Sequence, residues 1–370
     1  MILDQLTLTN FRNYCKSEFS FSAKTNLIVG PNTSGKSNLL EAIYFLATGK
    51  SLRVKTVERE VIRYGEEICR VIGNIREIGD IEEDKGEKGL EILLTFGEVR
   101  GEKAGKKKYL VNGVAKRAVD FVGNLRAVYF GPEDLQLITD SPSLRRKYLD
   151  MVLSQVDREY ARASLSYEKG LRSRNKLLEE MKETGKVDRR RLYFWDQLLI
   201  KNGNIISEGR RDFIDFLNSD REIKDIGEIG DFRVEYDMTV ISEERLVKYK
   251  DEEVAAGTTL VGPHRDDLKF RIKGEGAKEG EVGRDLSIFG SRGEQRLAIL
   301  WLKLGELAFI KQRTATLPVL LLDDIFSELD VEHRKLVFDL IGGSQTIITT
   351  ADVGAVEEKW LEGVKVINLT

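Results

Sequence analysis

The sequence predicts an α/β protein that carries a helical insertion. Three observations support this: an apolar strand runs into a glycine-bearing loop and a helix, a long middle region has helical spacing, and in the last third helices alternate with apolar runs. The chain has 370 residues, whereas one domain ordinarily holds roughly 100 to 200, so we expect two lobes.

The first third of the chain is predicted to contain strands and one early helix. Apolar and polar residues alternate from Ile2 to Leu8, and an apolar run ends at Val29. The next segment, residues 36–47, is apolar on one face and rich in helix formers. Further strands are expected over residues 68–75, 90–96 and 108–111, and a solvated loop over residues 79–89. The pair Asn112-Gly113 is typical of a hairpin turn, so these strands are predicted to form an antiparallel subsheet.

The spacing of apolar residues changes at Pro132, where a helical pattern begins and continues to about Leu217. Strands are expected again over 232–240 and 268–272, before a Gly- and Glu-rich loop over 274–283. The remainder predicts helix 293–310, strand 318–322, helix 331–341, strand 346–350 and strand 364–369. We therefore predict a helical lobe over residues 131–230, inserted between residues 1–130 and 231–370.

Composition excludes several classes of protein. Lys and Arg number 59 against 62 Asp and Glu, a net charge of -3, so contacts with nucleic acid must come from local basic clusters. Two cysteines and two histidines provide neither a disulfide framework nor a Cys/His metal cluster. The amino terminus lacks signal-peptide features and no apolar run approaches about 18 residues, so we expect a cytoplasmic protein.

The strongest motif is a phosphate loop. Its pattern, G-x-x-x-x-G-K-[ST], is matched by Gly30, Pro31, Asn32, Thr33, Ser34, Gly35, Lys36 and Ser37. Backbone N–H groups and the following helix amino terminus attract phosphate, Lys36 bridges phosphate oxygens, and the Ser37 hydroxyl ligates Mg²⁺. A chance match in a glycine-containing turn is the alternative, which the flanking strand and helix disfavour.

A pair of carboxylates follows the apolar run at residues 318–322. A buried parallel strand delivers its last residues to the carboxyl edge of the sheet, where ligands bind. We expect Asp323 to hold Mg²⁺ through water and Asp324 to orient or deprotonate an attacking water. The alternative, in which the pair merely caps the strand, is weakened by the phosphate loop upstream.

A third motif, Ser291-x-Gly293-Glu-Gln, opens a helix with an apolar face. Ser291 is expected near the N-cap, which makes a second anion site, although an ordinary capped helix has the same pattern. The order of the motifs favours the anion site over the ordinary capped helix. This order resembles that of the head of ATP-binding-cassette ATPases, which is related to SMC and Rad50 heads: a phosphate loop, an insertion, this helix, the two carboxylates, and Asp330 after Ser327.

This resemblance implies an ABC-type ATPase head: a phosphate-loop sheet and an antiparallel β subdomain, with ATP and Mg²⁺ as cofactors. It implies a head-to-head dimer in which Ser291 and Gly293 reach the partner's γ-phosphate and Asp330 communicates across the interface. Residues 1–130 and 231–370 would then be the two parts of the ATPase lobe. Thr349 and Thr350 stand where such heads usually carry a switch histidine.

Within this superfamily the chain resembles the RecF family over nearly its whole length. The segments that carry the likeness are residues 10–14, 38–43, 132–135, 141–150, 262–267 and 322–330. The resemblance implies ATP-driven dimerisation on gapped DNA or single-/double-strand junctions, and partnership with RecO and RecR in loading RecA. It places this activity in recombinational repair, replication restart and the SOS response, with weak DNA-dependent ATPase activity.

By the same resemblance, Arg12 would approach the nucleotide and the turn at residues 132–134 would join the lobes. The chain departs from the family at Thr33-Ser34, where many relatives carry a glycine, and at Asp140, where glycine is usual.

Clusters of basic residues are the candidates for contacts with the DNA backbone. They are Lys106 to Lys108 with Lys116-Arg117, Arg145 to Lys147, Arg189 to Arg191, and Arg210-Arg211. Each is equally compatible with a solvated face.

Two alternative functions stay open. The first is an SMC-like chromosome-organising head, which the absence of long heptads disfavours. The second is an ATP-binding structural clamp without significant turnover, which the short side chain of Asp324 favours.

Overall fold

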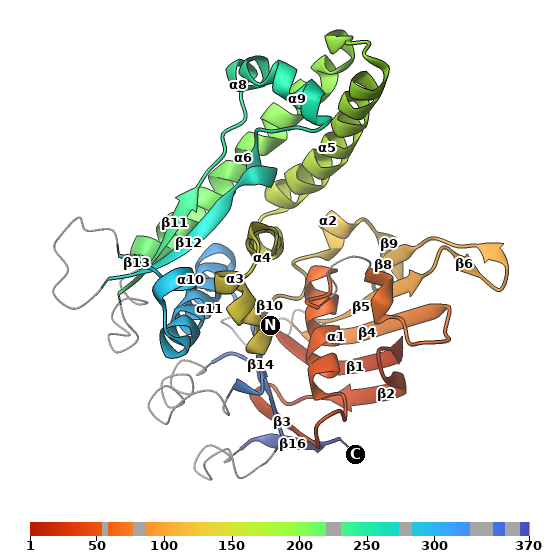
Figure 1. The fold of residues 1–370 in the computed structure, drawn as a ribbon. Helices are drawn as coiled ribbons and strands as arrows, with labels where there is room; N and C mark the ends of the chain where they lie inside the picture. Colours follow the sequence, from red (N-terminus) through yellow and green to blue (C-terminus); the bar gives the residue numbers. More distant parts are fainter. Residues whose placement is uncertain are drawn as a thin grey trace. The chain divides into compact units, whose positions relative to one another are not determined.

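The computed structural model describes residues 1–53, 58–76, 86–219, 231–273, 283–325, 343–351 and 363–369. The chain forms two compact units (Figure 1): the first consists of Met1–Glu133 and Glu306–Thr370, the second of Asp134–Gly305. Parallel and antiparallel sheets are both present, which confirms the predicted α/β class with an antiparallel subdomain. Among the described helices, none is long and apolar enough to cross a membrane.

A five-stranded parallel sheet forms the base of the first unit. Its strand order is β10-β14-β15-β3-β16, and its members are β3 (Thr25–Val29), β10 (Ala127–Phe130), β14 (Val319–Asp323), β15 (Thr346–Thr350) and β16 (Lys365–Asn368). Every residue of β10, β14 and β15 is buried, as expected of central parallel strands covered on both faces. The predicted strands over 318–322, 346–350 and 364–369 are thus confirmed to within about two residues.

The antiparallel sheet of the first unit has the order β2-β1-β4-β5-β8-β9. Its strands are β1 (Ile2–Phe11), β2 (Tyr14–Ser20), β4 (Ile68–Arg76), β5 (Glu87–Thr95), β8 (Lys107–Val111) and β9 (Val114–Lys116). Asn112 and Gly113 have φ of 51° and 75° in the turn between β8 and β9, which confirms the predicted hairpin. The loop predicted over 79–89 ends earlier than expected, because β5 begins at Glu87.

Helix α1 (Lys36–Thr48) contacts strands of both sheets, so nearly all of its residues are buried. Leu39, Ile43 and Phe45 are completely inaccessible to solvent. The helix ends at Gly49, whose φ of 67° suits a residue without Cβ. Smaller elements of this unit are α2 (Ala118–Phe121), β6 (Glu98–Val99) and β7 (Glu102–Lys103), together with a short helical turn at Glu58–Val61.

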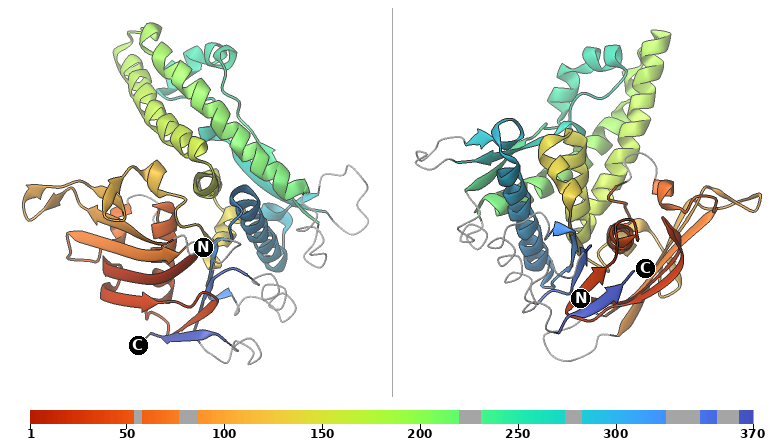
Figure 2. Two further views of the ribbon diagram at one scale, coloured as in Figure 1. Left: turned by 180° about the vertical axis from the view of Figure 1, so that it is seen from behind. Right: turned by 60° about the horizontal axis from the view of Figure 1, so that its bottom comes forward.

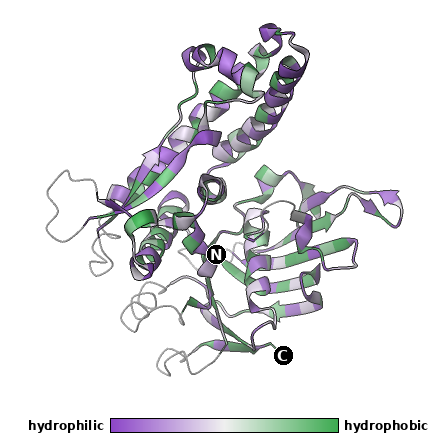
Figure 3. Cartoon of the chain, viewed as in Figure 1, coloured by the Kyte–Doolittle hydropathy of each residue, from purple (hydrophilic) through white to green (hydrophobic). Residues whose placement is uncertain are grey.

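The second unit is built on two long helices, α5 (Arg158–Thr184) and α6 (Tyr193–Ser219), which pack side by side (Figures 1 and 2). Both mix hydrophobic and hydrophilic residues along their length, as amphipathic helices do (Figure 3). The unit also contains α3 (Gln136–Thr139), α4 (Pro142–Val156), α8 (Glu243–Lys248), α9 (Lys250–Ala256) and α10 (Leu286–Phe289). Helix α11 (Arg292–Thr314) belongs to it as far as Gly305, and the rest of α11 to the first unit. A small sheet completes the unit: β11 (Phe232–Asp237), β12 (Asp267–Ile272) and β13 (Arg284–Asp285).

The second unit extends beyond the predicted insertion of residues 131–230. Residues 231–305, which we expected in the C-terminal part of the ATPase lobe, pack with the long helices instead. The reason lies in contacts between distant segments: the amide of Asn218 on α6 pairs with both backbone groups of Val234, at 2.9 and 3.0 Å. The functional division of the chain into parts of an ATPase lobe and an insertion stays a prediction.

Buried arginines tie the second unit together. Arg210 of α6 is 3 % exposed and donates to Asp266 at 2.8 Å, to Asp150 at 3.0 Å and to the Pro263 carbonyl at 2.7 Å. Arg145 of α4 makes a bidentate pair with Asp267, at 2.7 and 3.1 Å. Because each guanidinium lies against carboxylates from distant segments, these pairs fix the loop at residues 262–267 to the helices.

Candidate functional site

The phosphate loop lies between β3 and α1, at the carboxyl edge of the parallel sheet. Gly35 occupies the N-cap position of α1 with φ of 104°, and no side chain caps the helix. The first N–H groups of a helix lack intrahelical partners, so this end of α1 presents donors to an anion. A Cβ on Gly35 would come within 2.5 Å of the Asn13 amide, which explains the glycine.

The loop contains a buried polar atom without a partner. Ser34 Oγ is inaccessible to solvent and makes no hydrogen bond with any described residue. A buried hydroxyl without a partner is costly, and a bound phosphate oxygen would satisfy it. Together with the uncapped helix, this atom shows that the residues present fit a phosphate group.

Lys36 is 8 % exposed, and its ammonium donates to the carbonyls of Gly30 and Pro31 at 2.7 and 3.0 Å. The lysine therefore lies across its own loop, within reach of any phosphate that the loop holds. The predicted departure at Thr33 has a structural consequence, because Thr33 adopts φ of 75°. This left-handed conformation costs a residue with Cβ roughly 1–2 kcal/mol, so the loop carries backbone strain.

Asp323 collects four donors at the end of β14. Its Oδ1 accepts from Ser37 at 2.9 Å and from Thr349 at 2.7 Å. Its Oδ2 accepts from the Tyr129 hydroxyl at 3.0 Å and from Arg53 at 3.2 Å. The described residues contain no cluster of three or more His, Cys, Asp or Glu. A site for Mg²⁺ here would thus combine one carboxylate and one hydroxyl with ligand oxygens, which is a usual arrangement for this ion.

Asp324 directly follows the strand and adopts a left-handed φ of 52°. Its backbone N–H donates to Thr349 Oγ1 at 3.0 Å, so the same threonine holds both acids. Burial, and after it the charge of Asp323, raises the pKa of the Asp324 carboxyl, whereas Lys36 lowers it. A raised pKa makes a carboxylate a better proton acceptor, as a general base requires.

Sequence reasoning missed a second layer of groups around Asp323. Arg53 bridges Asp323 and Glu133, with a distance of 2.8 Å from its Nε to Glu133 Oε1. Tyr129 donates to the same two carboxylates, at 3.0 Å each. Arg53 lies outside every recognised motif, and the only available signal was its position shortly after the phosphate-loop helix.

The turn between β1 and β2 supports the phosphate loop. Tyr14 donates to the Gly35 carbonyl at 3.0 Å, and Asn13 donates to the Ser34 carbonyl at 3.3 Å. Burial raises the pKa of Tyr14 to about 12, so its hydroxyl stays a donor. Arg12 makes a bidentate pair with Glu41 of α1, at 2.8 and 2.9 Å. The pair fixes Arg12 on the flank of α1, and its approach to a nucleotide stays a prediction.

Ser291 caps α11 as the sequence predicts. The Glu294 N–H donates to Ser291 Oγ at 3.2 Å, and the Ser291 N–H donates to Glu294 Oε2 at 2.8 Å. This reciprocal pair is a capping box. Nearby, Gln295 donates to the Leu286 carbonyl at 2.8 Å, while its buried Oε1 has no partner among the described residues.

The surface around Ser291 is open and partly apolar. Gly293 is exposed, and a Cβ there would meet only Ser291 Oγ, at 3.9 Å. Nothing among the described residues therefore requires a glycine in this first helical turn, where glycine is unfavourable. Ile288 and Phe289 just before the motif are 71 % and 64 % exposed. Two exposed apolar side chains, next to a glycine that no described residue requires, are typical of a surface that another molecule covers.

The predicted site residues fall into three groups. Lys36, Ser37, Asp323 and Asp324 come together in the first unit. Ser291 and Gly293 belong to the second unit. Asp330, together with the helix expected over residues 331–341, lies outside the described residues.

The basic clusters separate into buried and exposed groups. Arg145 and Arg210, two members of the candidate clusters, are buried and paired with carboxylates, so neither is available to a phosphate backbone in this structure. In the cluster of the first unit, Lys106, Lys108 and Lys116 are exposed. Arg189, Arg190 and Arg191 each pair with a surface carboxylate, and their side chains stay 41 %, 93 % and 45 % exposed. Exposed pairs of this kind are weak and can exchange for phosphate.

Comparison with known proteins gives matches along the whole chain. The family model described as "RecF/RecN/SMC N terminal domain" matches residues 2–368. "DNA replication and repair protein RecF" from Bacillus cereus strain G9842 is 34 % identical over 387 residues, which cover 100 % of this chain and 97 % of that protein. Its counterpart in Bacillus thuringiensis strain Al Hakam has the same identity and coverage.

Comparison with solved structures gives similar proteins of the same family. The "recombination mediator protein RecF-ATP in RecFOR pathway" has a TM-score of 0.82 and 33 % identity, covering 96 % of this chain and 93 % of that one. The corresponding RecF-ATPrS structure has a TM-score of 0.80 at 32 % identity, covering 96 % and 94 %. An Smc head bound to the C-winged helix domain of ScpA, 19 % identical, has a TM-score of 0.50 over 99 % and 93 % of the two chains, a likeness of fold alone.

Proposed function

Since the chain belongs to the RecF family of DNA replication and repair proteins, within the RecF/RecN/SMC group of ATPase heads, we propose that it is an ATP-dependent DNA-binding protein of recombinational repair and replication restart. The observation that carries the proposal is the phosphate loop joined to Asp323 through Ser37, at 2.9 Å, below an uncapped helix end.

In this proposal the first unit binds ATP with Mg²⁺. The bound nucleotide supplies a triphosphate whose charge the cation partly neutralises. The loop N–H groups and Ser34 Oγ hydrogen-bond phosphate oxygens, and Lys36 leaves the Gly30 and Pro31 carbonyls to do the same. Ser37 and Asp323 hold the cation, and Asp324 accepts a proton from water.

The second unit completes the site of another copy. Ser291 and its helix end supply donors to the γ-phosphate held by the partner, and Gly293 permits close approach of the two chains. Ile288 and Phe289, both largely exposed, are buried in the ATP-bound dimer. Asp330 communicates between the two sites. ATP thus drives head-to-head dimerisation, because each nucleotide contacts both chains.

The dimer binds gapped DNA or single-/double-strand junctions in the cytoplasm and acts with RecO and RecR to load RecA, as part of the SOS response. Exposed Lys106, Lys108 and Lys116 are the basic groups of the first unit suited to the DNA backbone. With the chain at a net charge of -3, binding is expected to depend strongly on these local charges and on salt. Weak DNA-dependent ATP hydrolysis releases the dimer.

The test is binding of a fluorescent gapped duplex, measured by anisotropy with Mg²⁺–ATP, with Mg²⁺–ADP and without nucleotide. We expect ATP to tighten binding at least about 10-fold, which is about 1.4 kcal/mol. The double substitution Ile288→Ser/Phe289→Ser should remove this gain. A matched control, Tyr193→Ser/Phe194→Ser, alters two aromatic side chains that are 65 % and 63 % exposed elsewhere in the second unit, and should retain it.

Equal DNA affinity under all three conditions would contradict the proposal. If ATP tightens binding but no phosphate is released, the chain is an ATP-binding clamp without significant turnover. The side chain of Asp324, shorter than the glutamate that many such heads carry there, favours this second candidate because it reaches less far towards a water molecule.

A further inference from the structure

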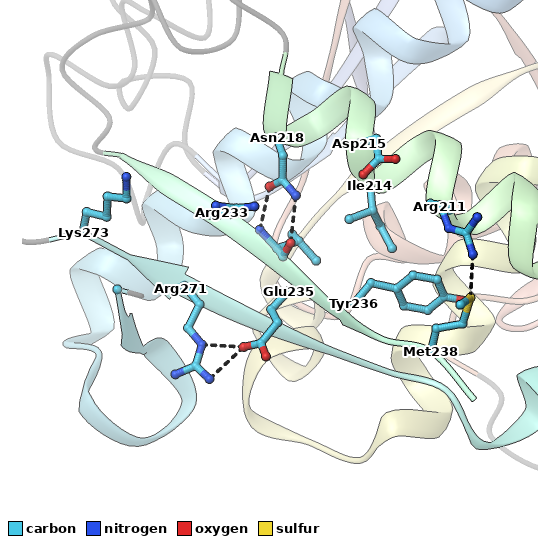
Figure 4. A pocket seen from close by; sticks show the side chains of 12 residues that line it. Arg211, Ile214, Asp215, Asn218, Arg233, Glu235, Tyr236, Met238, Arg271 and Lys273 are labelled. Atoms are coloured by element: carbon cyan, nitrogen blue, oxygen red, sulfur yellow. Dashed lines mark hydrogen bonds and ion pairs between the residues drawn. The ribbon is translucent and has the colours of Figure 1, made fainter. Parts of the chain in front are cut away.

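A pocket of about 530 Å³ lies in the second unit, between the last turns of α6 and the strands β11 and β12 (Figure 4). Its volume is typical of sites that hold a small molecule or a few residues of a peptide. None of its lining residues belongs to the motifs assigned above to ATP. They include Arg211, Ile214, Asn218, Arg233, Tyr236 and Met238.

The lining is rich in positive charge. Arg211, Arg233, Arg271 and Lys273 face two acids, Asp215 and Glu235. Among the described lining residues, only Arg271 is closely paired, with Glu235 at 2.8 and 3.0 Å. The described lining therefore has a net positive charge in a chain whose net charge is -3, so an anionic ligand is favoured.

Among the described residues, two of these cations lack a carboxylate partner. Arg211 hydrogen-bonds the Met238 sulfur at 3.1 Å, and Arg233 has no ion pair there. Lys273 lies 3.9 Å from Asp231, at the limit of an ion pair. The guanidinium groups of Arg211 on α6 and Arg233 on β11 can therefore bind carboxylates or phosphates without first breaking an ion pair with a described residue.

The other groups of the pocket are apolar or already occupied. Met238 and Ile214 offer an adaptable apolar surface. The Asn218 amide is used on both sides by the backbone of Val234. The Tyr236 hydroxyl donates to Asp266 at 2.5 Å, which fixes the ring in place. The amide and the hydroxyl of the lining are thus already used, and the guanidinium groups remain as donors.

From this combination of unpaired cations, apolar surface and occupied polar groups, we propose that the pocket binds a short acidic peptide segment of a protein partner, with an apolar side chain seated near Met238. Arg211 and Arg233 bind its carboxylates. A nucleic acid is the less suitable ligand, because it would use the charges but leave the apolar surface of Ile214 and Met238 uncovered. The site needs neither ATP nor DNA, so it is independent of the function proposed above.

The experiment uses the full chain without nucleotide and a short fluorescein-labelled peptide of alternating aspartate and leucine. We expect a Kd of about 1–100 µM by anisotropy. The double substitution Arg211→Glu/Arg233→Glu should weaken binding at least about 10-fold. The matched control is Arg158→Glu/Arg162→Glu, the same change of charge at two exposed arginines of α5, which should alter the affinity less than about 2-fold.

Two comparisons decide the outcome. A peptide with asparagine in place of aspartate should bind much more weakly, and labelled oligothymidylate should bind the double variant as well as it binds the wild type. The proposal is overturned if both peptides bind alike, if the double variant retains the acidic peptide, or if oligothymidylate competes for the pocket. ATP-dependent binding of gapped duplex, measured on the same variants, reports separately on the proposed function.

Discussion

The phosphate loop of the first unit and the loop at residues 262–267 of the second unit handle their polar groups in opposite ways. The phosphate loop leaves groups unsatisfied: a buried hydroxyl on Ser34 and an uncapped helix end. In the second loop, the Asp266 carboxylate accepts from Arg210, from Tyr236 and from the Thr239 N–H. A satisfied network stabilises the fold, whereas unsatisfied donors at a loop are ready for a ligand.

The difference extends to the basic residues. In sequence, Arg210 and Arg211 form a single cluster, yet Arg210 is 3 % exposed and Arg211 lies on the surface of the pocket. Lys36 is buried as well, but its partners are loop carbonyls rather than carboxylates. A buried cation at a loop that has no carboxylate partner, such as Lys36, thus indicates a site for an anionic ligand. A buried cation held by two carboxylates, such as Arg210, indicates a role in stabilising the fold.

The largest effect is expected at the buried pair. Arg210→Ala leaves Asp266 and Asp150 without their cation and should lower the free energy of unfolding by about 3–5 kcal/mol. Arg211→Ala should change it by less than about 0.5 kcal/mol. Urea unfolding followed by tryptophan fluorescence measures both, with Trp195 and Trp301 reporting from the second unit. Equal losses for the two neighbours would contradict the comparison.

Next is the lysine of the phosphate loop. Lys36→Met should weaken binding of Mg²⁺–ATP at least about 100-fold, roughly 2.7 kcal/mol, because it removes the ammonium group that lies across the loop. Titration calorimetry measures the affinity. Lys16→Met, at an exposed position of β2, is the control and should bind as the wild type does. If Lys36→Met kept its affinity for Mg²⁺–ATP, the proposal that the phosphate loop binds the nucleotide would be contradicted.

The third prediction concerns pH and the second unit. His264 accepts from the Tyr167 hydroxyl at 2.8 Å and donates to the Thr259 carbonyl at 3.1 Å. Burial lowers its pKa from 6.5 to about 4. The folded chain therefore holds this histidine neutral, so its contribution to stability is present above about pH 6.5 and is lost as the pH falls towards 4.

His264→Gln should reduce this acid sensitivity by roughly 2–3 kcal/mol between pH 7 and pH 4. Thermal unfolding followed by circular dichroism at several pH values measures it. An identical pH profile in wild type and variant would mean that the histidine is not buried in its neutral form. Phosphate-loop function at pH 7 should be unaffected, since His264 belongs to the second unit.

The smallest effect is expected from the strained threonine. Thr33→Gly removes a Cβ from a residue with φ of 75°, while it also increases the entropy of the unfolded chain. We expect a net gain in stability of roughly 0.5–1 kcal/mol, visible as a higher unfolding temperature of the first unit, together with tighter nucleotide binding. A lower unfolding temperature would show that the threonine side chain makes stabilising contacts that outweigh the strain.

The sequence predicted those parts of the site that are contiguous. Gly30 to Ser37 form a recognisable loop, and Asp323 and Asp324 follow a buried strand, so both could be placed at one sheet edge. Arg53 and Tyr129 could not be found, because they meet Asp323 from 270 and 194 residues away in the chain and belong to no pattern.

The fold was likewise predictable where it depends on local patterns in the sequence, and not where it depends on contacts between distant residues. Periodicity located the strands of both sheets in the first unit and the long helices of the second. It could not show that residues 231–305 join the helices, because that follows from pairs such as Arg145 with Asp267, which are 122 residues apart. For the same reason the burial of Arg145 and Arg210 was missed: a cluster of arginines in sequence does not reveal the carboxylates that will face them.

The composite site is the central claim, and sedimentation velocity of two complementary variants tests it most directly. Ser291→Arg keeps its phosphate loop, and Lys36→Met keeps its capped helix end, so one complete site forms only when a chain of each kind meets the other. With Mg²⁺–ATP each variant alone should sediment as a monomer, and the equimolar mixture should form a dimer. Dimers of Ser291→Arg alone, or a mixture that stays monomeric although wild type dimerises, would contradict the account.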